Sequence, residues 1–140
     1  MRFERLLDIG CGDGAVTQKF KPIVNHISVT EVSTNMCKRL KKTAFIDEVF
    51  EIETLPEGKF DLIACLNVLD RCDRPSDLLY DIKTRLEPIS GRFFLALNLP
   101  FCPFVEDGAK QRAPSQDLKM NGGRCKSKNS VEQAANCLIN

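Results

Sequence analysis

Three glycines and two acids near the start of the chain are well suited to binding a cofactor. Gly10, Gly12 and Gly14 alternate along the sequence, directly after an apolar run that ends in Asp8 and Ile9. Glycine permits positive φ angles and a close approach between backbone and ligand. The pattern therefore predicts a cofactor-binding turn at the end of a buried strand.

Asp8 and Asp13 flank this turn, and two roles are open for them. Either acid could bind a cationic group of the cofactor, or it could fix the turn by accepting hydrogen bonds from backbone N–H groups. Glu31 lies 23 positions after Asp8. Nucleotide-binding folds place a carboxylate at about this spacing, where it accepts hydrogen bonds from ribose hydroxyls.

An amide and an acid, Asn67 and Asp70, follow a later apolar run, residues 60–66. They are three positions apart, so a turn would bring them to one side. Because ligands of parallel sheets bind beyond the carboxyl ends of the strands, we expect Asp8, Glu31 and Asn67 to face one crevice.

Alternating strands and helices must position these residues. This alternation predicts an α/β fold with a mostly parallel sheet flanked by helices. The strands are predicted over residues 5–9, 26–30, 60–66 and 92–99, with residues 44–50 ambiguous. The helices are predicted from residue 14 or 15 to 20, over residues 35–42 with Ser33 as N-cap, over residues 75–86 with Asp73 as a candidate N-cap, and over residues 130–139 as a short terminal helix. Residues 106–129 are predicted to be loop or disordered.

Composition limits the partners. A 140-residue chain with a formal net charge of +1 has no general attraction to nucleic acid or membrane. No apolar stretch is long enough to span a bilayer, and no signal peptide is present, so a cytoplasmic or other intracellular location is expected. The seven cysteines show no zinc-ligand spacing, so we expect no metal site and mostly reduced thiols. The sequence indicates no oligomeric state.

Two levels of resemblance narrow the function. The G-x-G-x-G pattern preceded by an acid resembles the first motif of class I methyltransferases that use S-adenosylmethionine. A nicotinamide or flavin site, whose fingerprint is G-x-G-x-x-G, is the alternative for this loop alone. Residues 66–75, LNVLDRCDRP, resemble a signature of the DREV (methyltransferase-like protein nine) family. So do LEPISGR at residues 86–92 and ALNLPFCPFVE at residues 96–106. The resemblance implies a Rossmann-like class I methyltransferase fold.

The resemblance also implies an activity, protein-L-histidine N-pros-methylation. Such an enzyme transfers a methyl group from S-adenosylmethionine to the π nitrogen (Nδ1) of histidine in His-x-His segments of protein substrates. By position, the loop with Asp8, Gly10 and Gly12 would bind the cofactor and Glu31 its ribose. Asn67 is expected to contact both the cofactor and the target imidazole.

Asp70 would contact the target imidazole too. A carboxylate that accepts the Nε2–H bond leaves Nδ1 with its lone pair, and it stabilises the imidazolium that methylation creates. Neutral imidazole is already nucleophilic, so no strong base is needed, and catalysis would rest mainly on positioning.

The chain offers about five of the seven strands that the family's fold has, so we expect the last strands to be missing. Residues 1–106 are then predicted to be an incomplete methyltransferase domain, and residues 107–140 a polar, flexible segment. Two alternatives stay open: a weak or inactive truncated protein that acts as a binding module, and a class I methyltransferase with another acceptor, such as lysine or a small metabolite.

Overall fold

The computed structural model describes residues 2–52, 54–99 and 101–118, and the chain divides into two compact units. Unit one comprises Met1–Leu66 and Tyr80–Leu95, and unit two comprises Asn67–Leu79 and Ala96–Asn140. Each unit is described by itself. The predicted domain boundary after residue 106 stays a prediction, and the predicted terminal helix at residues 130–139 lies outside the described residues.

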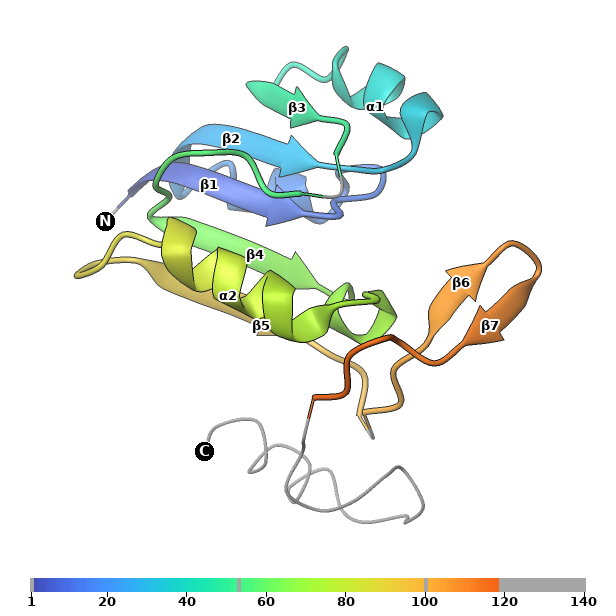
Figure 1. The fold of residues 1–140 in the computed structure, drawn as a ribbon. Helices are drawn as coiled ribbons and strands as arrows, with labels where there is room; N and C mark the ends of the chain where they lie inside the picture. Colours follow the sequence, from blue (N-terminus) through green and yellow to red (C-terminus); the bar gives the residue numbers. More distant parts are fainter. Residues whose placement is uncertain (1, 53, 100, 119–140) are drawn as a thin grey trace. The chain divides into compact units, whose positions relative to one another are not determined.

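A five-stranded sheet in the order β3-β2-β1-β4-β5 forms the centre of unit one (Figure 1). Its strands are β1 (Phe3–Ile9), β2 (Val24–Thr30), β3 (Glu48–Phe50), β4 (Leu62–Leu66) and β5 (Arg92–Ala96). The pairs of β1 with β2, β1 with β4, and β2 with β3 are all parallel. The predicted mostly parallel sheet is therefore confirmed.

The central strand β1 explains the apolar run that precedes the glycines. Leu6 and Leu7 are fully buried, because β1 has a neighbouring strand on each side and is covered on both faces. In the register of the sheet, Asp8 lies opposite Val29 of β2 and opposite Ala64 of β4. The carboxyl ends of these three strands therefore meet at one edge of the sheet, where the glycine turn begins.

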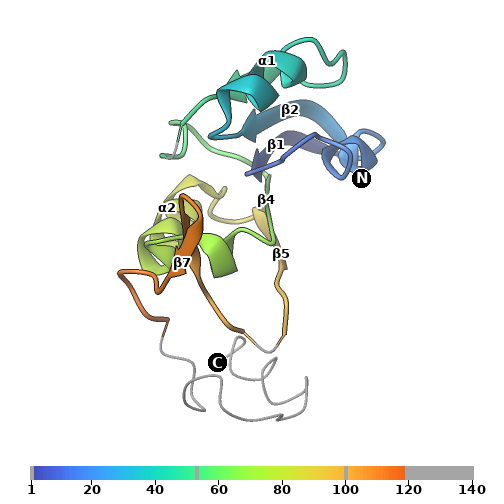
Figure 2. The ribbon, with the colours of Figure 1, turned by 90° about the vertical axis from the view of Figure 1, so that its right-hand side faces the viewer.

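Short helices connect the strands. They are the 3-10 helix η1 (Thr17–Phe20) and the α-helices α1 (Thr34–Leu40) and α2 (Pro75–Arg85). In Figure 2, the part of α2 that belongs to unit one, from Tyr80 onwards, and the blue η1 segment beside the N-terminus lie on opposite sides of β4 and β5. As expected, Ser33 caps α1, its hydroxyl accepting a 3.4 Å bond from the N–H of Met36.

The expected α-helix at residues 14–20 is reduced to η1, and that prediction was too long. Gly14 has a φ of +79°, which is outside the right-handed helical region, so the helix cannot begin there. The strands predicted at 60–66 and 92–99 are also shorter than expected. Phe60 instead forms an isolated bridge with Leu86.

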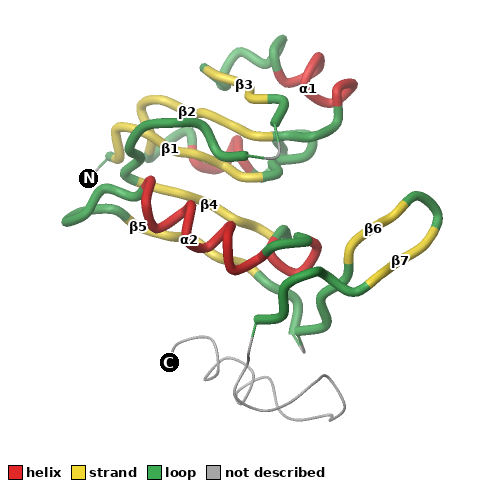
Figure 3. Tube along the Cα trace, in the orientation of Figure 1, coloured by secondary structure: helices red, strands yellow, loops and turns green. Residues whose placement is uncertain are grey.

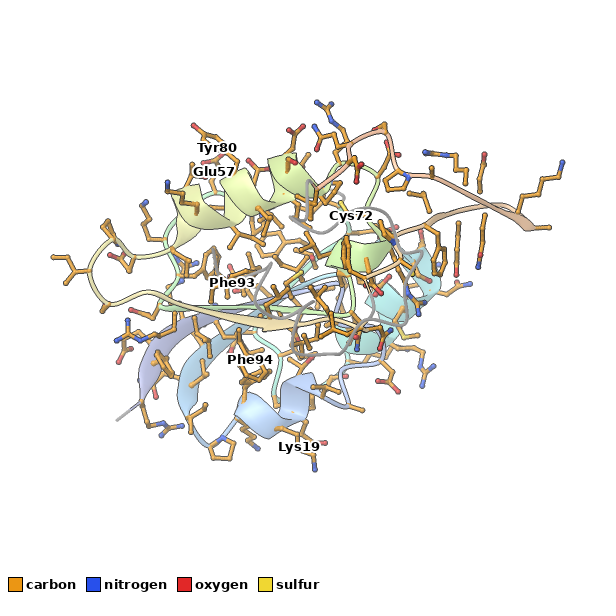
Figure 4. The ribbon with its side chains drawn as sticks, turned by 90° about the horizontal axis from the view of Figure 1, so that it is seen from below. Lys19, Glu57, Cys72, Tyr80, Phe93 and Phe94 are labelled. Atoms are coloured by element: carbon orange, nitrogen blue, oxygen red, sulfur yellow. The ribbon has the colours of Figure 1, made fainter. Side chains whose placement is uncertain are left out.

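The strand β5 is the last strand in the order of the sheet. Its neighbouring side chains Phe93 and Phe94 point to opposite faces, as Figure 4 shows, and are 36% and 52% exposed. The ring of Phe94 contacts that of Phe20 edge to face, at a centroid distance of 6.0 Å.

Unit two contains the 3-10 helix η2 (Leu69–Arg71) and an antiparallel hairpin of β6 (Val105–Asp107) and β7 (Lys110–Arg112), shown as strands in Figure 3. The hairpin lies where a loop was predicted from residue 106 onwards. Cys11, Cys37 and Cys72 carry free thiols, as expected, whereas Cys102 is disulfide-bonded. Across the described ranges, no helix is both long and apolar enough to cross a membrane.

Candidate functional site

The glycine turn has the backbone conformation that its sequence predicts. Gly10, Gly12 and Gly14 have φ angles of +63°, +59° and +79°, which side chains on L-residues disfavour. A Cβ atom on Gly14 would lie 3.2 Å from Cδ2 of Leu40, so this glycine packs closely against α1. A Cβ atom on Gly12 would meet nothing within 4 Å, which leaves the backbone open to a ligand there.

Asp8 is a buried acid directly before the turn, with 2% of its surface exposed. Its Oδ2 accepts a 2.6 Å hydrogen bond from the hydroxyl of Thr17. Burial raises the pKa of Asp8 from 3.8 to about 6, and the Thr17 bond opposes part of that rise. The fold therefore holds an acid here whose ionisation is unfavourable until a cation or another donor joins it.

Glu31 directly follows β2, and its side chain links the end of that strand to the glycine turn by a hydrogen bond. Its Oε2 accepts a 3.1 Å bond from the N–H of Gly12, and its Oε1 accepts 2.9 Å bonds from the N–H groups of Val32 and Ser33. A carboxylate has about four lone-pair positions. About one of them is left for a ligand hydroxyl, at Oε2, while these three bonds persist.

The other acid of the turn, Asp13, is exposed and makes a local contact. Its Oδ1 accepts a 3.0 Å bond from the N–H of Ala15, which is the backbone-fixing role left open above. Two threonines also fix the site and were missed from the sequence. Thr17 binds Asp8, and the Thr30 hydroxyl accepts a 3.1 Å bond from the N–H of Gly10. The only sequence signal for these roles was position, since Thr17 follows the glycines and Thr30 directly precedes Glu31.

Cys11, inside the turn, is not a nucleophile in this structure. Burial raises the pKa of its thiol to about 12, and the negative charges of Asp8 and Glu31 add to that rise. The thiol therefore stays protonated at neutral pH. Within the described residues, no group of three or more His, Cys, Asp and Glu side chains could hold a metal ion.

Asn67 and Asp70 lie in unit two, directly after β4. Asn67 has a φ of +56°, the only positive value on a residue other than glycine in the described part of the chain. Its N–H donates a 2.9 Å bond to the carbonyl of Ala96, which is consistent with parallel pairing of β4 and β5. Such a conformation costs about 1 kcal/mol or more, and asparagine is among the residues that tolerate it best.

Asp70 sits in η2 with 4% of its surface exposed. Its backbone carbonyl accepts a 2.9 Å bond from the N–H of Phe104. Its side-chain Oδ1 is buried and has no hydrogen-bond partner among the described residues. An unsatisfied buried oxygen costs about 1–3 kcal/mol, so the position is unfavourable unless a ligand supplies a donor.

Comparison with known proteins gives the family and two curated relatives. The family model described as DREV methyltransferase matches residues 1–140. Two mitochondrial ubiquinone biosynthesis O-methyltransferases, from Schizosaccharomyces pombe and Saccharomyces cerevisiae, are 27% and 28% identical to the chain. The alignments cover 66% and 65% of this chain but 37% and 32% of those proteins. The chain thus spans about a third of the length of these relatives.

A solved structure shows the same fold. An S-adenosylmethionine-dependent methyltransferase from Clostridium acetobutylicum superposes with a TM-score of 0.60 and 20% sequence identity. The match covers 69% of this chain and 43% of that chain. The predicted Rossmann-like fold of the class I methyltransferases is therefore confirmed for the matched part.

Proposed function

The chain belongs to the DREV methyltransferase family, and from this premise we propose that it transfers a methyl group from S-adenosylmethionine to histidine. The acceptor atom would be the π nitrogen (Nδ1) of a histidine in a His-x-His segment of a protein. The buried, unpartnered Oδ1 of Asp70 is the observation that supports this acceptor most strongly.

An imidazole N–H group is a suitable donor for Asp70. When Asp70 accepts the Nε2–H bond, the ring is held in the tautomer whose lone pair is on Nδ1. The bond also satisfies the oxygen that is otherwise left without a donor. As Nδ1 gains the methyl group, the ring becomes positively charged, and the nearby carboxylate stabilises that charge in a buried, low-dielectric setting.

The glycine turn and two acids fit the cofactor. Gly12 leaves open backbone for a close approach, and Oε2 of Glu31 keeps about one lone-pair position for a ribose hydroxyl. Asp8 is a buried acid that an ammonium group would stabilise. When bound, S-adenosylmethionine supplies an electrophilic methyl group on its sulfonium. Asn67, whose strained backbone follows β4, is placed in the proposal beside both ligands.

A second candidate is methylation of an oxygen atom. The names of the two yeast relatives, which are ubiquinone biosynthesis O-methyltransferases, favour it. A phenolic acceptor must lose its proton as the methyl group arrives, and Asp70 could accept that proton. The histidine acceptor requires no such proton transfer from an oxygen, and this difference separates the two candidates experimentally.

The test is methyl transfer from radiolabelled S-adenosylmethionine to a peptide with alternating histidine and alanine. The chain contains one histidine, His26, between Asn25 and Ile27, so the chain itself has no His-x-His segment. The controls are the same peptide with alanine in place of histidine, and a catechol. We expect label in the histidine peptide alone.

Variants at two acids sharpen this test. Asp70→Asn removes the charge but keeps the shape, and we expect kcat/KM to fall about 100-fold or more with unchanged calorimetric binding of S-adenosylmethionine. Asp107→Asn, at an exposed position in the β6–β7 hairpin, is the matched control and should leave turnover unchanged. Transfer to the catechol but not to the peptide would reject the histidine acceptor. Cofactor binding with no transfer would favour a binding module.

A further inference from the structure

A segment far along the chain holds the loop that carries Asp70. The acceptor loop is defined here as residues 67–73 and the strap as residues 104–116, and both belong to unit two. The N–H of Phe104 donates a 2.9 Å bond to the carbonyl of Asp70. The guanidinium of Arg71, the next residue, lies 5.4 Å from the centroid of the Phe104 ring, a favourable cation–π distance.

The strap makes its most concentrated contacts at Asp73. One oxygen of this carboxylate, Oδ1, accepts a 2.6 Å bond from Nη1 of Arg112 and a 3.0 Å bond from the N–H of Ser115. The other, Oδ2, accepts a 2.8 Å bond from the Ser115 hydroxyl. The bond from Arg112 and those from Ser115 lower the pKa of Asp73 to about 2, so the carboxylate stays ionised at neutral pH.

A third contact extends from the strap to the beginning of α2. The side-chain oxygen of Gln116 accepts bonds of 3.1 and 3.2 Å from the N–H groups of Ser76 and Asp77, and its nitrogen donates a 2.8 Å bond to Asp77. The strap thus satisfies backbone donors that the first turn of a helix leaves free. The acceptor loop is tied at Asp70, at Asp73 and just beyond its end.

These contacts divide the polar groups of the loop into two kinds. The carbonyl of Asp70 and the carboxylate of Asp73 are taken up by the strap, whereas Oδ1 of Asp70 is left without a partner. An isolated exposed ion pair would fix the loop weakly. Here one carboxylate receives three donors from two strap residues, which gives directional control as well as charge attraction.

We propose that Asp73 is a positioning residue, whose bonds to Arg112 and Ser115 hold the acceptor loop so that the free oxygen of Asp70 meets the acceptor. This inference rests on the proposed function. Asp73 itself contacts no reacting atom in the proposal. Its effect reaches the reaction through the placement of Asp70, where small displacements lower turnover strongly.

The test compares Asp73→Asn and Arg112→Gln with Arg74→Gln in the full chain. Arg74 pairs with Asp77 at 2.6 Å, the same length as the Arg112–Asp73 bond, but this pair joins the residue before α2 to the first turn of α2 and does not involve Asp73. Two readouts are used: hydrogen exchange at the amide of Phe104, and kcat and KM for the His-x-His peptide and for S-adenosylmethionine. Arg112→Lys, which keeps one charged donor, is the conservative variant.

In Asp73→Asn and Arg112→Gln, we expect the hydrogen of the Phe104 amide to exchange with solvent at least about fivefold faster than in the wild type. We also expect both variants to lower kcat/KM for the peptide about five- to tenfold. The KM for S-adenosylmethionine should not change, Arg112→Lys should recover part of the loss, and Arg74→Gln should behave as wild type. The proposal is overturned if exchange does not change, if exchange rises with no change in peptide kinetics, or if Arg74→Gln has the same effect. A wild-type chain that transfers no methyl group to the peptide refutes the proposed function instead, and the positioning role with it, whatever the exchange result.

Discussion

Replacing Asp8 with asparagine should change how the stability of the fold depends on pH. Burial raises the pKa of Asp8 from 3.8 to about 6 in the folded chain. Between these values the folded state binds more protons than the unfolded state, so the free energy of unfolding falls as pH rises from about 4 to about 6. Below pH 4 both states hold the proton, and above pH 6 the loss is complete.

The size of the effect follows from the shift. About two pKa units, at 1.36 kcal/mol each, correspond to about 3 kcal/mol of stability lost above pH 6. Asparagine does not titrate, so its variant lacks this loss. The difference in unfolding free energy, Asp8→Asn minus wild type, should therefore rise by about 2–3 kcal/mol between pH 4 and pH 7.5.

Urea denaturation at the two pH values measures this difference. Any constant cost of the asparagine N–H groups cancels, because it contributes equally at both pH values. Thr17→Val removes the bond that opposes the rise in the Asp8 pKa, so it should enlarge the total fall in stability and extend it to higher pH. A difference between Asp8→Asn and wild type that does not vary with pH would refute the reasoning.

Three further predictions concern the same unit. Glu31→Gln should weaken calorimetric binding of S-adenosylmethionine about tenfold or more, because a charged acceptor that holds the turn is lost, and equal affinity would contradict this. Gly14→Ala should lower the unfolding free energy by about 1–2 kcal/mol because of the positive φ of Gly14. In urea denaturation it should cost more than Gly12→Ala, because of the two positions only Gly14 is crowded by Leu40. Equal costs would contradict this packing argument. Hydrogen bonds from the Ser28 hydroxyl, the larger cause, and from His26 lower the pKa of Glu48 in the folded chain. The stabilisation from Glu48 is therefore complete above pH 4.5 and is lost as pH falls through the lowered pKa. Glu48→Gln should reduce this loss of unfolding free energy at acid pH, and an unchanged loss would contradict the prediction.

Local patterns predicted the sheet, the glycine turn and the position of Glu31 after β2. The apolar run at Leu6 and Leu7 and the glycines after it form β1 and its turn, because burial and positive φ are properties of the residues themselves. The spacing from the glycines predicted Glu31 as a ribose ligand, which stays a prediction; in the structure its carboxylate accepts a bond from the N–H of Gly12. The Ser33 cap was likewise readable from the sequence.

Contacts between distant segments could not be predicted in the same way. The strap bonds from Arg112 and Ser115 to Asp73 join residues about 40 positions apart, and polar residues in a segment without periodicity gave no signal of them. The sequence placed Asp73 before Pro75 as an ordinary helix cap, whereas its carboxylate is held by the strap and Gln116 caps α2 instead. The burial of Asp70 depends on packing, which a turn pattern does not report.

The position of the transferred methyl group tests the central claim most directly. After reaction with labelled S-adenosylmethionine, the His-x-His peptide is hydrolysed and the two methylhistidine isomers are separated by chromatography. We predict label in the π isomer, because Asp70 holds Nε2–H and leaves Nδ1 as the nucleophile. Label in the τ isomer, or label on the catechol with none in the peptide, would contradict the role given to Asp70.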